Sequence, residues 1–534
     1  MPQFPGGKAI EGAMTAEPNP PTGRVAVALG FGAMCLGMFM AILDIQIVAT
    51  SLPTIQSHLR IEPDDASWMQ TAYLIAEIVA IPLTGPLEAV LGLRRLFAIA
   101  VLVFTLASCG CAASGGFAGL VSWRVLQGFS GGMLIPLVFA AVFILFEPRR
   151  QSVATTVAGV LAVLAPTVGP IAGGWMTSTF SWHWLFLVNV VPGLLATLGG
   201  WLLLPRMAAS VREWREIDLA SVAMLGGGLA ALVIALKEAP RLGWTSSSVI
   251  LEFSVAAALG ASLLARCRRT DPPLLDLSLF RQRNFAFGCV MSFVLGIALF
   301  GSVYLMPVFL AYVRGHDAFA VGRIMLATGL AQLLSAPVAV ALEPRVDARL
   351  LTGFGFVLLT LGLWASGGQS VSTDAAEMVV PQVLRGTAFM FCLLPPTRLA
   401  LGNLPEERVA AASGLFNLMR NLGGAIGLAL IDTVIYGGAP RHAEAIVRSL
   451  RAGDAATAEA IGLPGLLSTD RSIVIGERAM TSLLQPLVRR AALTETVNSS
   501  WLLVGALTAT VLLILPFARP VAQERSDRDR QGER

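Results

Sequence analysis

Long apolar runs separated by short polar stretches dominate this sequence of 534 residues. A membrane-crossing helix needs about twenty consecutive apolar residues, and repeated runs of that length are typical of a chain that crosses a bilayer many times. The pattern predicts an all-α, polytopic membrane protein with fourteen spans. They are expected near residues 25–50, 67–90, 95–113, 120–146, 152–176, 184–205, 217–236, 247–265, 288–313, 320–342, 349–366, 378–401, 411–435 and 499–518.

Composition supports this interpretation. The chain is 55% hydrophobic and only 13% charged, and its mean hydropathy is +0.72, which is too apolar for a protein with a water-facing surface. Residues 1–24 contain no apolar core, so the first span is expected to be uncleaved and not a signal peptide.

The placement of basic residues predicts the orientation. Arginine pairs such as Arg94-Arg95 and Arg149-Arg150, and a group around Arg266, follow even-numbered spans or precede odd-numbered ones. Under the positive-inside rule these loops are cytoplasmic, and with an even number of spans both termini are cytoplasmic too. A multi-pass protein of the bacterial inner membrane, surrounded by lipid, is expected.

Several functions are excluded by residue content. The only lysines are Lys8 and Lys237, so a phosphate-binding Gly-x-x-x-x-Gly-Lys loop cannot be formed, and nothing indicates nucleic acid binding. The six cysteines lie in or beside apolar spans, and the four histidines are scattered. No metal site, cofactor or catalytic set is predicted, so the protein is not expected to be an enzyme.

An internal repeat divides the chain. Val125-Leu126-Gln127-Gly128 in the fourth span recurs as Val383-Leu384-Arg385-Gly386 in the twelfth. Two related six-span halves with a surplus pair between them are therefore predicted. The expected parts are an N-terminal cytoplasmic segment (1–24), the first half (25–205), two linking spans with their loops (206–287), the second half (288–518) and a cytoplasmic tail (519–534).

The fifth span carries two prolines and three glycines within the stretch 165–174. Prolines remove helix hydrogen bonds, and glycines four residues apart let another helix backbone approach closely. This favours a packing seam that moves, although static packing of small residues would give the same spacing. The residues concerned are Pro166, Gly169, Pro170, Gly173 and Gly174.

This stretch resembles the antiporter motif of major facilitator drug exporters, with Ala165 in place of the first glycine. The run from Trp182 to Gly193 resembles the fourteen-helix drug:proton antiporter family of the EmrB/QacA type, most closely the EmrB-like multidrug exporters. The resemblance implies the major facilitator fold and proton-coupled efflux of hydrophobic drugs or toxic small molecules by alternating access.

Charged residues inside the spans are the candidates for proton coupling, because a charge in hydrocarbon is costly. Asp44 and Arg124 match family motifs of the first and fourth helices, and both are expected in the outer half of the membrane. A structural salt bridge is the alternative for Arg124. Glu77, near the middle of the second span, could line the cavity or bridge two helices.

Further polar residues within spans are candidates for the lining of the substrate cavity. Asp432 lies near the outer end of its span, where exposure to headgroup water is expected. The candidates are Gln46, Gln127, Arg385, Arg420 and Asp432.

The second inner loop resembles the cytoplasmic latch of the family, formed here by Gly85, Glu88, Gly92, Arg94 and Arg95. It departs from the family pattern, because Ala89 replaces the usual acid and Val90 the usual base. Glu88 could stand in for the missing acid. This departure favours the alternative of a membrane sensor that binds a ligand without transporting it.

Residues 437–498 form a predicted outer loop that is too long for a turn. The EmrB resemblance implies that a periplasmic adaptor (membrane fusion) protein, and through it an outer-membrane channel, contacts this segment. A hairpin without a partner is the alternative. Export of one specific metabolite, such as a siderophore, amino acid or fatty acid, also remains open.

Overall fold

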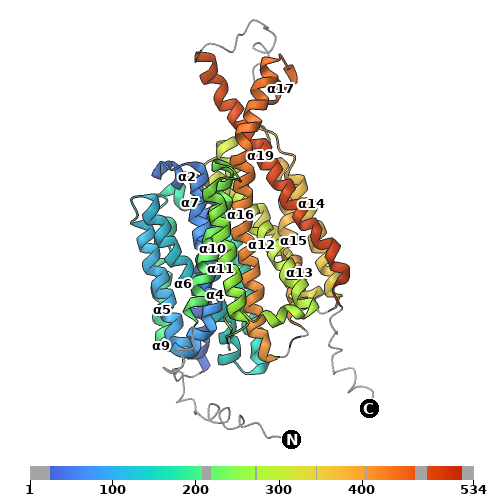
Figure 1. The fold of residues 1–534 in the computed structure, drawn as a ribbon. Helices are drawn as coiled ribbons and strands as arrows, with labels where there is room; N and C mark the ends of the chain where they lie inside the picture. Colours follow the sequence, from blue (N-terminus) through green and yellow to red (C-terminus); the bar gives the residue numbers. More distant parts are fainter. Residues whose placement is uncertain are drawn as a thin grey trace.

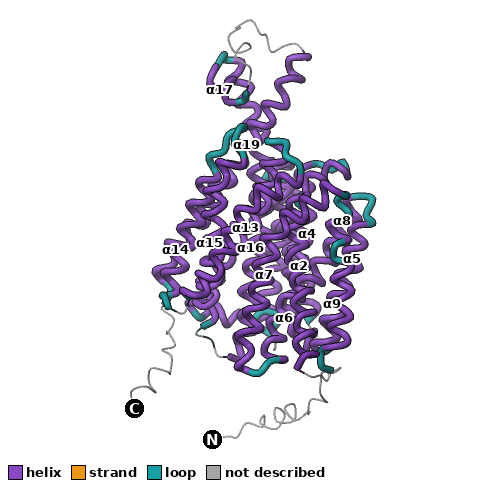
Figure 2. Tube along the Cα trace, turned by 180° about the vertical axis from the view of Figure 1, so that it is seen from behind, coloured by secondary structure: helices purple, strands orange, loops and turns teal. Residues whose placement is uncertain are grey.

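The computed structural model describes residues 24–206, 218–270, 273–343, 345–402, 404, 406–462 and 478–519. Helices joined by loops make up this part of the chain (Figures 1 and 2). Within it, 14 helical segments are long and apolar enough to cross a membrane. The predicted all-α fold and the predicted number of spans are confirmed.

The first helix group consists of α2 to α9, which pack mainly on one another. Buried apolar side chains from all of its long helices form its core. Its members are α2 (Arg24–Leu59), α3 (Pro63–Ala66), α4 (Trp68–Leu91), α5 (Leu93–Ala112), α6 (Phe117–Leu145), α7 (Pro148–Thr179), α8 (Trp184–Leu187) and α9 (Val190–Leu203).

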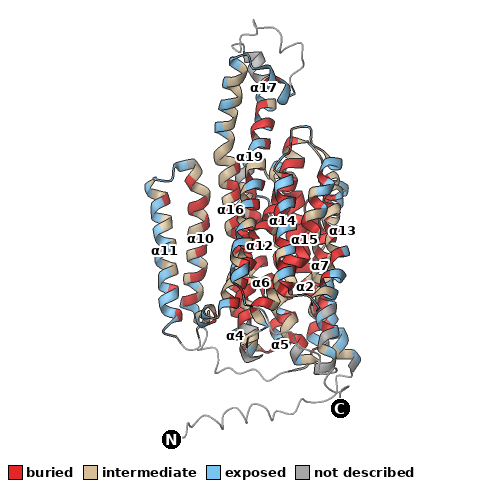
Figure 3. Ribbon diagram, turned by 90° about the vertical axis from the view of Figure 1, so that its right-hand side faces the viewer, coloured by how far each residue is buried: buried red, intermediate tan, exposed pale blue. Residues whose placement is uncertain are grey.

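The two linking helices, α10 (Leu219–Leu242) and α11 (Ser247–Cys267), stand as a pair beside the bundle (Figure 3). Asp218 caps α10 by accepting from the Ser221 backbone N–H, and it forms an ion pair of 2.7 Å with Arg266 of α11. Hydrogen bonds from Arg266 hold the pKa of Asp218 well below its usual range. Only α10 packs closely on the bundle, against α4 and α16.

The second helix group follows and also packs mainly on itself. Its core is rich in Phe, Leu and Met side chains. Its members are η2 (Leu277–Arg281), α12 (Arg283–Val308), η3 (Phe309–Val313), α13 (Ala318–Leu342), α14 (Ala348–Ser366), α15 (Ala375–Leu401), α16 (Glu406–Arg451), α17 (Ala455–Ala460), α19 (Arg478–Ile514) and η4 (Leu515–Phe517).

The segment predicted as a long outer loop, 437–498, is mostly helical in its described part. Helix α16 continues to Arg451 and α19 already begins at Arg478, so both helices extend well beyond the predicted ends of their spans (Figure 1). Ile461, Val488 and Ala491 form a small core between them. Apolar runs do not indicate these extensions, because backbone hydrogen bonds continue a helix whether or not its side chains are apolar. Residues 463–477 lie outside the described residues.

These extensions and α17 form a projection that we name the hairpin (residues 437–462 and 478–498), and the end of the bundle that carries it is the hairpin end (Figure 2). Near this end the two helix groups are joined. There the Tyr312 hydroxyl donates to Gln56 Oε1 over 3.1 Å. Nearer the middle of α7 and α13, the Thr167 hydroxyl donates to the Gly329 carbonyl over 3.1 Å.

Helices α7 and α13 make the closest seam between the two groups. A Cβ atom added to Gly174 would lie 2.2 Å from the Ala318 carbonyl oxygen, and one added to Gly322 would lie 2.3 Å from that of Pro170. Both distances are far below van der Waals contact, so the backbones meet only because these positions lack side chains.

We expect Gly174→Val to destabilise the protein by about 1–3 kcal/mol, because the added side chain must force α7 and α13 apart. The matched control is Gly159→Val on the same helix, where an added Cβ meets nothing within 4 Å. Thermal unfolding in detergent compares the two variants. Equal melting temperatures would show that the seam tolerates the extra volume.

Candidate functional site

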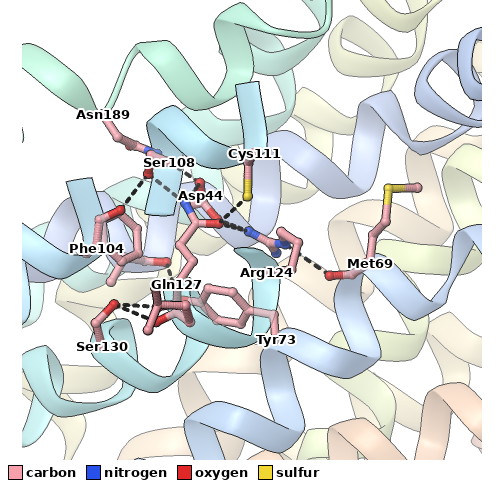
Figure 4. Close-up of polar contacts among 12 residues, drawn as sticks. Asp44, Met69, Tyr73, Phe104, Ser108, Cys111, Arg124, Gln127, Ser130 and Asn189 are labelled. Atoms are coloured by element: carbon pink, nitrogen blue, oxygen red, sulfur yellow. Dashed lines mark hydrogen bonds and ion pairs between the residues drawn. The ribbon is translucent and has the colours of Figure 1, made fainter. Parts of the chain in front are cut away.

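Asp44 on α2 is fully buried in the first helix group and is surrounded by hydrogen-bond donors (Figure 4). Arg124 on α6 forms an ion pair with Asp44 Oδ2 through its Nη1. Oδ1 accepts from Gln127 Nε2 over 2.9 Å and from Asn189 Nδ2 over 2.8 Å. Because each donor is itself fixed by packing, the site is built to hold a carboxylate away from water.

Arg124 is fixed from several sides. Its Nε donates to the Met69 carbonyl of α4 over 3.0 Å, its Nη1 donates to Gln127 Oε1 over 2.6 Å, and its guanidinium lies 4.4 Å from the ring centre of Tyr73. Its Nη2 has no hydrogen-bond partner among the described residues. Asp44 and Arg124, both predicted as candidates for proton coupling, are therefore brought together, and the pair links α2, α4 and α6.

Asn189 was not among the residues predicted for the site. The sixth predicted span, 184–205, is interrupted, and Asn189 lies in the break between α8 and α9. This break directs its amide to Asp44 and to Ser108 Oγ, 3.4 Å away. The signal for Asn189 in the sequence was a polar residue within an apolar run. Ser108 also accepts from Gln127 Nε2 over 2.8 Å. Its signal in the sequence was weaker than that of Asn189.

Glu77 lies apart from this cluster, where α4 meets α16 of the second helix group. Its buried carboxylate faces Arg420 and Asn421, and its Oε2 has no hydrogen-bond partner in the described part of the chain. Arg420 Nη2 donates to Asn417 Oδ1 over 2.8 Å. Two predicted candidates from different groups are thus brought together.

The expectation that Asp432 is exposed is wrong, because only 4% of its surface is accessible. Lys237 Nζ of α10 lies 3.0 Å from its Oδ2, Ser67 donates to the same oxygen, and the Tyr304 hydroxyl donates to Oδ1 over 2.7 Å. The linking helix covers this carboxylate. Lys237 and Tyr304 were missed as partners, although a lysine in an apolar span was a usable signal.

Gln46 and Arg385, the other two candidates, lie elsewhere. Gln46 packs on α7, where a Cβ atom added to Gly169 would lie 2.4 Å from the Cβ atom of Gln46. Arg385 is buried in the second helix group, and its Nη2 lies 4.0 Å from the Met306 sulfur. Neither side chain belongs to the Asp44 cluster.

The motif of the fifth span lies in one continuous helix, α7, which includes Pro166 and Pro170. Gly169 and Gly173 face α2 of the same group, where a Cβ on Gly173 would lie 2.7 Å from the Ile47 carbonyl. Gly174 and Pro170 face α13 of the other group. The motif therefore has two packing faces, one within its group and one across the seam.

The latch residues lie at the end opposite the hairpin. Gly92 ends α4 with φ +76°, a conformation that favours glycine, and the added Cβ of Gly85 would meet nothing. The Arg94 guanidinium lies 4.8 Å from the ring centre of Trp201 on α9, while Arg95 is exposed. Among the described residues, no ion pair joins Glu88 to either arginine.

Comparison with known proteins identifies the family. The model of the Major Facilitator Superfamily matches residues 34–428. The chain belongs to this superfamily. Within it the chain is an EmrB-like member, which confirms the resemblance found in the fifth and sixth spans, and it is a transporter-family protein and not an enzyme. No cluster of three potential metal ligands occurs in the residues that the structure describes.

Two relatives show how far the likeness extends. The colistin resistance protein EmrB of Acinetobacter baumannii is 39% identical over 76% of this chain and 79% of that protein. The multidrug export protein EmrB of Escherichia coli K12 is 32% identical over 75% and 79%.

Among solved structures, a bacterial homolog of the human lysosomal transporter Spinster, inward-facing and unoccupied, matches with a TM-score of 0.59. The match covers 93% of this chain and 98% of that one, at 13% identity. At this identity the likeness supports the fold alone.

We expect Arg124→Gln to destabilise the protein by about 3–5 kcal/mol, because it leaves Asp44 as an uncompensated buried charge. The double variant Arg124→Gln with Asp44→Asn should recover most of the loss, since both charges are then absent. Thermal unfolding of the two single variants and the double variant in detergent measures the coupling. Losses that simply add would contradict a direct interaction.

Proposed function

We propose that this protein is a proton-coupled exporter of hydrophobic small molecules, with Asp44 as the proton site. The observation that carries the proposal is the buried Asp44 carboxylate, which receives donors from three other side chains. The names of the EmrB relatives, as multidrug export and colistin resistance proteins, support the substrate class.

The mechanism follows from the charge balance. An ionised Asp44 balances Arg124, whereas a protonated Asp44 leaves the guanidinium without its counter-ion and weakens the hold of α6 on α2. Two and three residues further along α2, Gln46 and Ile47 pack on the glycines of α7, and α7 forms the seam with the second group. Proton uptake would thus change the relative stability of the two alternating-access states, in which the helix groups are tilted differently against each other.

The proposed route of the substrate runs between the two groups, as is typical of this fold. Glu77 and Arg420 support this because α4 and α16 meet there and Glu77 Oε2 has no hydrogen-bond partner among the described residues. Gln46, on the α2 face toward α7, is a further candidate. Gln127 contributes to proton coupling instead, because it is bonded to Asp44.

The test is transport in proteoliposomes with an imposed pH gradient, screened over lipophilic cations, anions and weak acids. Asp44→Asn mimics the protonated acid, so it should keep substrate binding and downhill exchange but lose accumulation driven by the gradient. The control is Glu459→Gln, which removes an exposed acid in the hairpin. Full accumulation by Asp44→Asn would move the proton site elsewhere, with Glu77 as the next candidate.

The same assay separates the alternatives. Transport of one metabolite class alone, such as a siderophore, amino acid or fatty acid, would indicate a specific exporter. Binding without any transport would indicate a sensor, which the altered latch at Ala89 and Val90 would favour.

We further propose that the chain lies in the bacterial inner membrane with both termini cytoplasmic and the hairpin outside. The arginine clusters at the end opposite the hairpin support this orientation under the positive-inside rule. A cysteine replacing the exposed Arg451 should react with an impermeant maleimide in intact cells, and one replacing the exposed Arg95 should not. The reverse pattern would invert the orientation.

The hairpin is also the proposed contact for a periplasmic adaptor protein and, through it, an outer-membrane channel. Two long helices that project beyond the bundle support this, because they expose a large surface away from the bilayer (Figure 1). Replacing residues 443–492 by a short glycine-serine turn should preserve transport in proteoliposomes but lower drug resistance in cells. Unchanged resistance with normal expression would argue against an adaptor.

A further inference from the structure

A cavity of about 280 Å³ lies at the hairpin end of the second helix group. It is formed by the end of α14, the segment that follows it and one face of α15, with Met306 of α12. The lining residues include Met306, Ala365, Gln369, Glu377, Met378 and Arg385.

Arg385 is the deepest of the α15 residues that line this cavity. It lies ten residues after the first residue of the helix, Ala375, which corresponds to about 15 Å along the axis. The residue is 2% exposed, and its Nη1 has no hydrogen-bond partner among the residues that the structure describes. A buried cation normally has an anionic partner, because an unpaired charge is costly in a low-dielectric interior.

No ion pair is found for Arg385 in the described part of the chain. Its Nε lies 3.4 Å from the Pro381 carbonyl, its Nη2 lies 4.0 Å from the Met306 sulfur, and its guanidinium lies 4.4 Å from the ring centre of Trp501. These contacts fix the guanidinium in position but do not neutralise it. Trp501 Nε1 is likewise buried and has no hydrogen-bond partner within the described ranges.

The internal repeat allows Arg385 to be compared with the corresponding residue of the first helix group. Arg385 occupies the position that Gln127 has in Val125-Leu126-Gln127-Gly128. In the first helix group Gln127 donates to a carboxylate supplied by the protein, Asp44. In the second group the corresponding side chain is a stronger donor to anions, and among the described residues no carboxylate forms an ion pair with it.

We propose that this cavity binds a small organic monocarboxylate that enters from the hairpin end and pairs with Arg385. The apolar side chains of Met306, Ala365 and Met378 suit the hydrocarbon part of such a ligand, and Arg385 suits its carboxylate. Glu377, whose Oε2 accepts from the Asp374 backbone N–H over 2.8 Å, adds a negative charge to the lining. A second charge on the ligand would be repelled there, which favours a monoanion.

Benzoate is a suitable probe, and benzamide is its neutral isostere. In detergent, benzoate should raise the melting temperature of the wild-type protein in a saturable manner, while benzamide should not. Arg385→Gln should abolish the benzoate shift, and Arg451→Gln, which removes an exposed arginine of the hairpin, should retain it. An equal shift in Arg385→Gln, or no shift in the wild-type protein, would overturn the proposal.

A second variant tests the proposal even if Arg385→Gln fails to fold. Gly368 lines the cavity, and an added Cβ there would meet nothing within 4 Å, so Gly368→Phe should fold while filling the space. It should weaken benzoate binding without touching Arg385. A chloride titration completes the test, because a shift with chloride equal to that with benzoate would show an inorganic anion site instead. The readout is binding and not transport, so its result is independent of the role proposed for Asp44.

Discussion

The cost of a charge within hydrocarbon is the constraint on which this structure depends. The buried Asp44 and Arg124 pair with each other and share the donors around them. The buried charge of Asp432 is stabilised in the same way by Lys237, Ser67 and Tyr304, which come from three different parts of the bundle. Each solution ties separate helices together, so the charges fix relative helix positions that apolar packing alone would leave less defined.

Close contact between helices at glycine positions is the second constraint. Apolar surfaces gain little by association in lipid, so close backbone approach and interhelical hydrogen bonds take over. At the seam between α7 and α13, Gly174 and Gly322 provide the approach, and the bond from Thr167 to the Gly329 carbonyl provides the polar contact. Close packing of backbone is therefore what joins the two helices at these positions, and a side chain added at either glycine would push them apart.

The sequence predicts most of the fold, because hydropathy and the length of each run report directly on the membrane. The number of spans, the family and the choice of Asp44 and Arg124 as candidates all follow from local patterns. Asn189 could not be predicted as a hydrogen-bond donor to Asp44, because the direction of its side chain depends on the break between α8 and α9. The burial of Asp432 depends on the docking of α10, which is a tertiary contact that no local pattern encodes.

Helix α16 has a mechanical consequence. It is one element of 46 residues, or about 69 Å at the rise of an α-helix, and it carries Arg420, Asp432 and one side of the hairpin. A change in tilt where it meets α4 is transmitted along the same rod to the projecting tip, and displacement grows with distance from the pivot. The same change of tilt would therefore displace the tip of the hairpin further than it displaces Arg420 or Asp432, which lie nearer to the contact with α4.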